Sequence, residues 1–191
     1  MGTGGVRDDG VVESLRGKLL IAGPGLLDPN FRRTVVLVGA HDAEGALGVV
    51  LNRPTDLAVE EVAPPLAELA GSGARIYVGG PVRPTELVLL AELSEPAAPD
   101  VPVLGGIGFV TGEVDPGIAS SVRRARVFAG YAGWGAGQLE AELAQASWIV
   151  EPALPEDVFD RDPEGLWSAA LRRKGGRYVL LSTMPPDPSR N

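Results

Sequence analysis

Apolar residues in this chain gather in short runs of Val, Ile and Leu separated by Gly, Pro and Asp, a pattern typical of strands joined by turns. Strands are predicted over residues 17–22, 34–38, 45–51, 75–78, 86–93, 107–110, 123–129, 148–150 and 178–181. Helices are predicted over 57–69, divided at Pro64-Pro65, from Asp115-Pro116, from Gln138 and after Asp162-Pro163. Strand and helix do not alternate regularly, which indicates an α+β domain with a mixed sheet.

The second and third predicted strands have the spacing of an antiparallel hairpin. The segment 39–45 between them contains two glycines and is predicted to be the hairpin loop. His41, the one histidine of the chain, falls in this loop. We expect it to be a hydrogen-bonded turn or surface residue, with catalysis as a general base as the alternative.

The segment 126–140 sets two aromatic residues, Tyr131 and Trp134, among four glycines. It lies between a predicted strand and a predicted helix, so we interpret it as a strand-to-helix turn. Glycine there permits close approach of another backbone or of a ligand. The segment is therefore either a packing joint or a binding surface, and the sequence leaves both readings open.

Composition narrows the range of chemistry. The formal net charge of −8 disfavours broad attraction to nucleic acids or anionic membranes. The chain has no cysteine and a single histidine, so we expect no disulfide, no thiolate nucleophile and no metal or other cofactor. A length of 191 residues suits one domain, and with no long apolar run we expect a cytoplasmic protein.

Two further segments could bind an anion. Asn52-Arg53-Pro54 ends a predicted strand, and the Arg53 guanidinium could hold a carboxylate or phosphate; an ion pair with Asp56 is the alternative. Gly79-Gly80-Pro81 also follows a strand and could present backbone N–H groups, or simply reverse the chain. The run 105–108 lacks the full glycine pattern of a dinucleotide site, and the chain has no phosphate-binding loop of the Walker type.

Taken together, these segments resemble the YqgE/AlgH family of bacterial proteins. The resemblance spans residues 17–171 and rests on Asp28-Pro29-x-Phe31-Arg-Arg-Thr, His41, Gly45-Ala-x-Gly-x-x-x-Asn52-x-Pro54, Gly79-Gly-Pro81 and, most specifically, Gly130-Tyr-Ala-x-Trp134-x-x-Gly-Gln-Leu-Glu140. It implies an α+β domain with a mixed, largely antiparallel, bifurcated sheet, partly barrel-like and surrounded by helices. The predicted domain occupies residues 15–184, between a flexible leader (1–14) and a flexible tail (185–191). The family's regulatory label implies little chemistry.

Three functional hypotheses follow from these features. The first is a non-enzymatic cytoplasmic protein with an indirect regulatory role, which binds a small ligand or a protein partner and has no catalytic residues. Its candidate binding residues are Asn52, Arg53, Gly79, Gly80, Tyr131, Trp134 and Gln138. The second is a hydrolase or transferase at the same rim, with His41 or Glu140 as base. The third, disfavoured by the net charge, is a transcriptional regulator that binds DNA directly.

Overall fold

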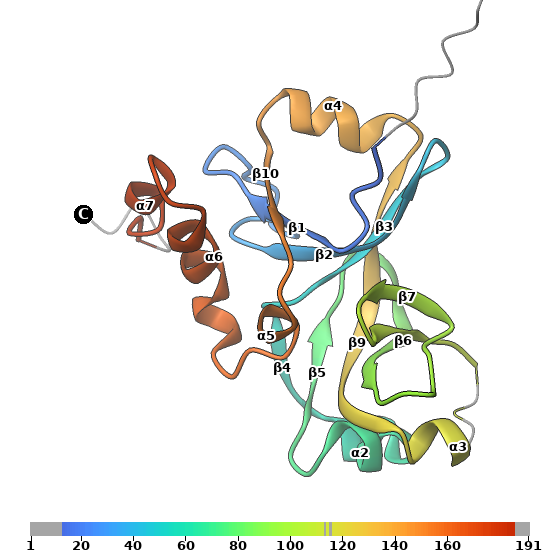
Figure 1. Ribbon diagram of the computed structural model, residues 1–191. Coiled ribbons are helices and arrows are strands. Elements are labelled where there is room, and N and C mark those ends of the chain that lie inside the picture. The colour runs from blue at the N-terminus through green and yellow to red at the C-terminus, as the bar shows by residue number, and fades with distance from the viewer. Residues whose placement is uncertain (1–12, 113, 115, 186–191) are drawn as a thin grey trace, which may run out of the picture.

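The computed structural model describes residues 13–112, 114 and 116–185. Ten strands form one branched sheet in the order β10-β1-β2-β3-β9-β6-β8-β7, with β4 and β5 off this path (Figure 1). The strands are β1 (Lys18–Ala22), β2 (Val35–Asp42), β3 (Gly45–Val50), β4 (Pro54–Ala58), β5 (Arg75–Val78), β6 (Val82–Leu93), β7 (Val101–Leu104), β8 (Ile107–Val110), β9 (Val122–Gly135) and β10 (Trp148–Pro152). Only the pairing of β5 with β9 is parallel among the described pairs. The expectation of a mixed, largely antiparallel sheet is confirmed.

The sheet branches at β9, which is 14 residues long. One edge of β9 pairs with β6; the other pairs with β5 through residues 127–129 and then with β3 through residues 132–135. Because β5 and β3 occupy successive parts of the same edge, the two halves of the sheet diverge there. The predicted bifurcation is thus confirmed. The barrel-like expectation needs correction, because within the described residues the path ends at β10 and β7 and does not close into a barrel.

Helices cover both halves of the sheet. They are α1 (Val59–Val62), α2 (Pro64–Ala70), α3 (Pro116–Ala119), α4 (Gln138–Ala144), α5 (Pro155–Val158), the short 3-10 turn η1 (Pro163–Gly165), α6 (Leu166–Lys174) and α7 (Tyr178–Leu181). In Figure 1, α4 lies above the upper half, α2 and α3 lie at the lower end, and α6 and α7 lie to one side. Within the described residues, no helix is long and apolar enough to cross a bilayer.

Three predictions of local structure are wrong. The glycine-aromatic segment is not a turn, because β9 runs through Tyr131 and Trp134 to Gly135. His41 lies in β2 and is only 8% exposed, because a bulge after Val38 extends the strand and leaves a shorter turn before Gly45. Residues 178–181 form α7 and not a strand; four apolar residues without flanking context fit either element.

Other local predictions are confirmed or lie outside the description. The break at Pro64-Pro65 separates α1 from α2, and Asp162 accepts a hydrogen bond from the Gly165 N–H at the start of η1. Asp115, the predicted helix cap, lies outside the described residues. So do the predicted leader, apart from residues 13–14, and the predicted tail, apart from Pro185.

The glycines near the branch point serve a close crossing of two backbones. Gly130 has a φ of +68°, and a Cβ on it would lie 2.6 Å from the carbonyl oxygen of Gly80. Any Cβ added to Gly79 or Gly80 would collide with the backbone of residues 130–132. These three glycines therefore let the chain after β5 pass against β9, a packing role that an L side chain could not fill.

Candidate functional site

Arg53 lies where the chains leaving β3 and β5 meet at the branch of the sheet. The Val78 N–H donates to the Arg53 carbonyl oxygen at 2.8 Å. One residue further, the Gly79 carbonyl accepts from the Val50 N–H and the Gly79 N–H donates to the Ala129 carbonyl, each at 2.8 Å. Backbone hydrogen bonds from three strands therefore fix the position of Arg53, whose side chain is half-buried.

Asn52 is buried, 7% exposed, and clamps a second arginine-bearing segment beside Arg53. Its side-chain oxygen accepts from the Val35 N–H at 2.9 Å, and its side-chain nitrogen donates to the Arg33 carbonyl at 2.9 Å. Arg33 is one of the few non-glycine residues with a positive φ, +56°. The two amide hydrogen bonds hold the chain in this conformation, so Asn52 positions Arg33 and is not itself presented to a ligand.

Three arginines converge on one cavity of about 430 Å³, which we call the arginine cavity. Its lining residues are Arg32, Arg33, Asn52, Arg53, Pro54, Glu164 and Trp167. The Arg33 guanidinium stacks 4.0 Å from the centre of a Trp167 ring and donates through Nη1 to the Met184 carbonyl at 2.7 Å. Arg53 donates through Nη2 to the Arg32 carbonyl at 2.7 Å. Backbone carbonyls thus hold both guanidinium groups in place, and the face of Trp167 also holds that of Arg33.

The electrostatics of the arginine cavity favour an anion. Within the described part of the chain, no carboxylate lies within ion-pair distance of Arg33 or Arg53, and Glu164 is the one acidic lining residue. Burial, followed by the neighbouring charge of Arg32, lowers the pKa of Arg33. Each guanidinium carries five N–H donors in a fork that matches a carboxylate or phosphate. The hydrogen bonds found among the described residues engage only one nitrogen of Arg33 and one of Arg53.

Arg53 also borders a second cavity, of about 380 Å³. This proline-lined cavity is surrounded by Pro29, Asn30, Val50, Arg53, Val78, Gly80, Pro81 and Pro84. Its walls are mostly apolar, so it could take the uncharged part of a ligand whose acidic group contacts Arg53.

The structure brings together only part of the predicted rim. Asn52, Arg53, Gly79 and Gly80 lie at the branch of the sheet, and Tyr131 pairs with Val82 beside them. Trp134 lies near the C-terminal end of β9 and Gln138 is the first residue of α4, and neither is among the residues around either Arg53 cavity.

Trp134 belongs to an aromatic cluster of the core. It is 6% exposed, and its ring lies 6.1 Å from that of Phe31 and 5.9 Å from that of Trp148. One carboxylate oxygen of Glu142 accepts from the indole N–H of both tryptophans, at 2.9 Å and 2.7 Å. Gln138 donates to the other oxygen of Glu142 at 3.0 Å. The packing reading of the glycine-aromatic segment accounts for these contacts.

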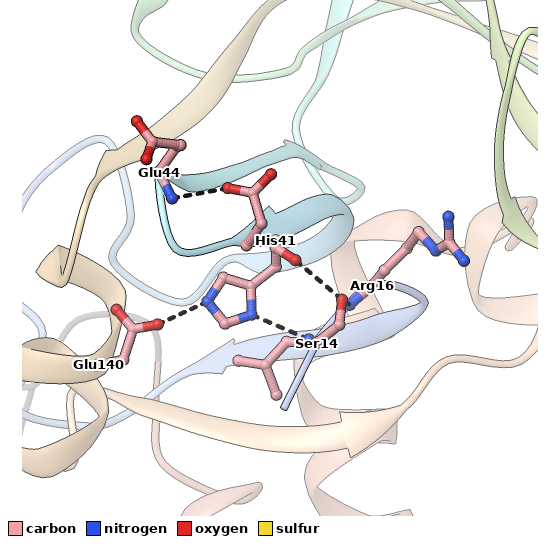
Figure 2. Close-up of polar contacts among 7 residues, drawn as sticks. Ser14, Arg16, His41, Glu44 and Glu140 are labelled. Atoms are coloured by element: carbon pink, nitrogen blue, oxygen red, sulfur yellow. Dashed lines mark hydrogen bonds and ion pairs between the residues drawn. The ribbon is translucent and has the colours of Figure 1, made fainter. Parts of the chain in front are cut away.

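His41 forms a separate polar contact with Glu140 (Figure 2). Its Nδ1 accepts from the Leu15 N–H at 3.0 Å, so Nε2 carries the proton and donates to Glu140 at 2.7 Å. The carboxyl pKa of Glu140 is lowered, first by a hydrogen bond from its own backbone N–H and then by that from His41. In this arrangement the imidazole keeps no free lone pair for a substrate proton, and His41 does not border the Arg53 cavities.

Sequence reasoning missed the other two arginines of the arginine cavity, Arg32 and Arg33, as well as its lining residues Pro54, Glu164 and Trp167. The two arginines follow the turn at residues 28–30, and the hydrogen bond from Asn52 to the Arg33 carbonyl depends on the β2–β3 register, which propensity alone does not give. Among residues 13–112, 114 and 116–185, no three His, Asp or Glu side chains form a group that could hold a metal ion.

Comparison with known proteins places this architecture among bacterial relatives. The AlgH-like family model matches residues 19–179. A UPF0301 protein of Streptomyces coelicolor is 45% identical, covering 94% of this chain and 97% of the relative, and one of Mycobacterium tuberculosis is 43% identical, covering 92% and 90%. The crystal structure of protein DIP2367 from Corynebacterium diphtheriae superimposes with a TM-score of 0.81 at 30% identity, covering 88% of this chain and 92% of that one. The solution structure of the AlgH protein from Pseudomonas aeruginosa gives a TM-score of 0.67 at 35% identity, with coverage of 97% and 98%.

Proposed function

This chain belongs to the AlgH-like family, and we propose that it is a non-enzymatic binding protein that recognises a carboxylate or phosphate group in the arginine cavity. The observation that carries the proposal is the convergence of three arginines on a cavity with a single acidic lining residue, where the guanidinium groups of Arg33 and Arg53 pair with no carboxylate of the described residues. Like charges held together in a partly buried site repel one another, and an anionic ligand would relieve this repulsion.

The geometry also suggests how a ligand would lie. Arg33 and Arg53 would grip the acidic group, and Asn52 would hold Arg33 in place through its carbonyl. The apolar part of the ligand would extend into the proline-lined cavity, which Arg53 also borders. Cavities of about 400 Å³ are in the range of small-molecule sites. This pair of cavities fits a small acidic metabolite better than it fits the flat surface of a protein partner.

The alternatives draw less support from the same contacts. An enzyme that uses His41 would need this imidazole beside the arginines, but its ring nitrogens are engaged by Leu15 and Glu140. Direct DNA binding would need an extended basic face, whereas the net charge is −8 and the arginine cavity is a local site. We place the binding in the cytoplasm and take any regulatory role to be indirect, through a partner that responds to ligand occupancy.

Isothermal titration with inorganic phosphate and with citrate, at about 50 mM salt, tests this proposal. We expect saturable binding by the wild type, and at least about a tenfold loss in Arg53→Met, since a hydrogen bond to a charged group is worth about 1.5–3 kcal/mol. Arg53→Lys should recover part of the affinity, because a lysine keeps the charge without the fork. Arg172→Ala, an exposed arginine on α6, is the matched control.

Two results would overturn the proposal. One is the absence of saturable binding by either anion up to millimolar concentration. The other is an affinity of folded Arg53→Met equal to that of Arg172→Ala. Trp134→Phe tests the remaining part of the predicted rim: unchanged binding assigns Trp134 to the core, and a tenfold loss assigns it to the site.

A further inference from the structure

A second basic groove lies where β5 separates from β9. β5 pairs with β9 only through residues 127–129, so the preceding residues 122–126 of β9 are paired on one side alone, with β6. A cavity of about 470 Å³ opens along this free edge, between α2 and the chain after α5. We call it the β9 groove. Four arginines line it: Arg75, Arg123, Arg124 and Arg126.

The positive charge of the β9 groove is only partly compensated by the protein. Arg124 pairs with Glu92 at 2.6 Å, and Arg75 pairs with Asp56 at 3.3 Å, where both side chains are largely exposed and the pair is weak. Arg123 is exposed, and among the described residues no carboxylate pairs with it or with Arg126. Glu68 is the one acidic residue in the lining.

Arg126 is partly buried and has no carboxylate partner among the described residues. Its guanidinium lies 4.2 Å from the centre of the Tyr77 ring and donates to the Asp160 carbonyl at 2.8 Å, so only neutral acceptors satisfy it among the described residues. Burial lowers the pKa of Arg126, against opposing effects of Tyr77 and Asp160. Arg124 is similarly stacked, 4.5 Å from the centre of the Phe159 ring. Two of the arginines are therefore held rigidly before any ligand arrives, which reduces the entropy lost on binding.

The spacing of the arginines selects the kind of anion. Arg123 and Arg126 are three residues apart on β9, so their Cα atoms lie up to roughly 10 Å apart, and Arg123 is the extra residue of a bulge opposite Glu92 and Leu93. Both residues border the β9 groove. A single phosphate contacting one of them would leave the other without a partner, whereas a chain of phosphates could reach both. We infer that the β9 groove is a binding site for a ligand with two or more linked phosphate groups, separate from the arginine cavity.

Titration calorimetry with inorganic tripolyphosphate tests this inference, with orthophosphate and a hexaglutamate peptide as comparisons. We expect tripolyphosphate to bind at least tenfold more tightly than either comparison. Arg123→Ala should weaken it about tenfold, because this exposed side chain contributes charge and little packing. Arg126→Met should weaken it at least as much if the variant folds, and Arg123→Ala keeps the test decisive if it does not.

Controls separate this site from the arginine cavity and from general charge attraction. Arg172→Ala removes the same charge from an exposed position on α6 and should bind tripolyphosphate as the wild type does. Arg53→Met disables the arginine cavity, so the preference for tripolyphosphate and its loss in Arg123→Ala should persist in the Arg53→Met background. Equal losses in Arg123→Ala and Arg172→Ala would overturn the inference. So would tighter binding of hexaglutamate, or loss of tripolyphosphate binding in Arg53→Met alone. A nucleoside triphosphate is titrated as a further comparison, and tighter binding than that of tripolyphosphate would show that a base adds affinity. Binding of the nucleoside triphosphate that is weaker than binding of orthophosphate would also contradict the inference.

Discussion

Replacing Glu142 by alanine tests how the glycine-aromatic segment is held in the core. One carboxylate oxygen of Glu142 accepts both indole N–H groups, and the two tryptophans are only 6% and 4% exposed. Glu142→Ala would leave both donors without this acceptor in a site that water scarcely reaches. A buried donor without a partner costs about 1–3 kcal/mol, so the two together should lower the free energy of unfolding by about 2–5 kcal/mol.

Urea denaturation followed by tryptophan fluorescence measures this loss directly, since two of the three tryptophans lie in the cluster. For a domain of this size the melting temperature should fall by about 6–15 °C. Glu142→Gln keeps a carbonyl oxygen as acceptor and should lose only about 1 kcal/mol, the difference between a charged and a neutral acceptor. Glu68→Ala, an exposed position on α2, is the control and should change stability by less than about 0.5 kcal/mol. Equal stability of Glu142→Ala and Glu68→Ala would refute the reasoning.

Three further predictions concern other contacts. Arg173→Ala would strip Asp157, 5% exposed, of two hydrogen bonds at 2.6 Å and 2.8 Å and cost about 3 kcal/mol in urea unfolding; a loss no larger than that of Arg172→Ala would contradict this. Gly130→Ala combines a positive φ with a backbone clash and should cost about 2–5 kcal/mol, whereas Gly133→Ala, with nothing nearer than 3.5 Å, should be tolerated; similar melting temperatures would argue against the close crossing. Because the folded-state pKa of Glu140 is depressed, its stabilisation is present above the unfolded-state carboxyl pKa and is lost as pH falls through the folded-state pKa. The stability difference between wild type and Glu140→Gln should therefore shrink on acidification, and a difference independent of pH would disprove the coupling.

The sequence predicted where strands and helices occur more accurately than where they begin and end. Val, Ile and Leu runs located eight of the ten strands and missed β4 and β7, and glycine was read as a break at the segment that includes Tyr131 and Trp134. There the buried residues Ala132 and Trp134 alternate with exposed Gly133 and Gly135, which is the period of a strand. That alternation was available in the sequence. Glycine is needed in this strand only where another backbone crosses it, at Gly130, and such a crossing is a tertiary property.

Only part of the candidate site was predicted from the sequence. Asn52, Arg53, Gly79 and Gly80 come together because strands β3 and β5 end at the same place. Arg33 joins them only through the fold: Asn52 clamps its carbonyl from 19 residues away, and Trp167 of α6 supplies the stacking face. Contacts of this kind depend on register and helix docking, which single-sequence patterns do not determine.

A crystal soaked in selenate tests the central claim, that the arginine cavity binds an anion. Selenate has the charge and tetrahedral shape of a doubly charged phosphate, and its selenium can be located by anomalous scattering. We predict an anomalous peak between the guanidinium groups of Arg33 and Arg53, absent from crystals of Arg53→Met. A cavity without a peak in wild-type crystals, or an unchanged peak in Arg53→Met, would contradict the account.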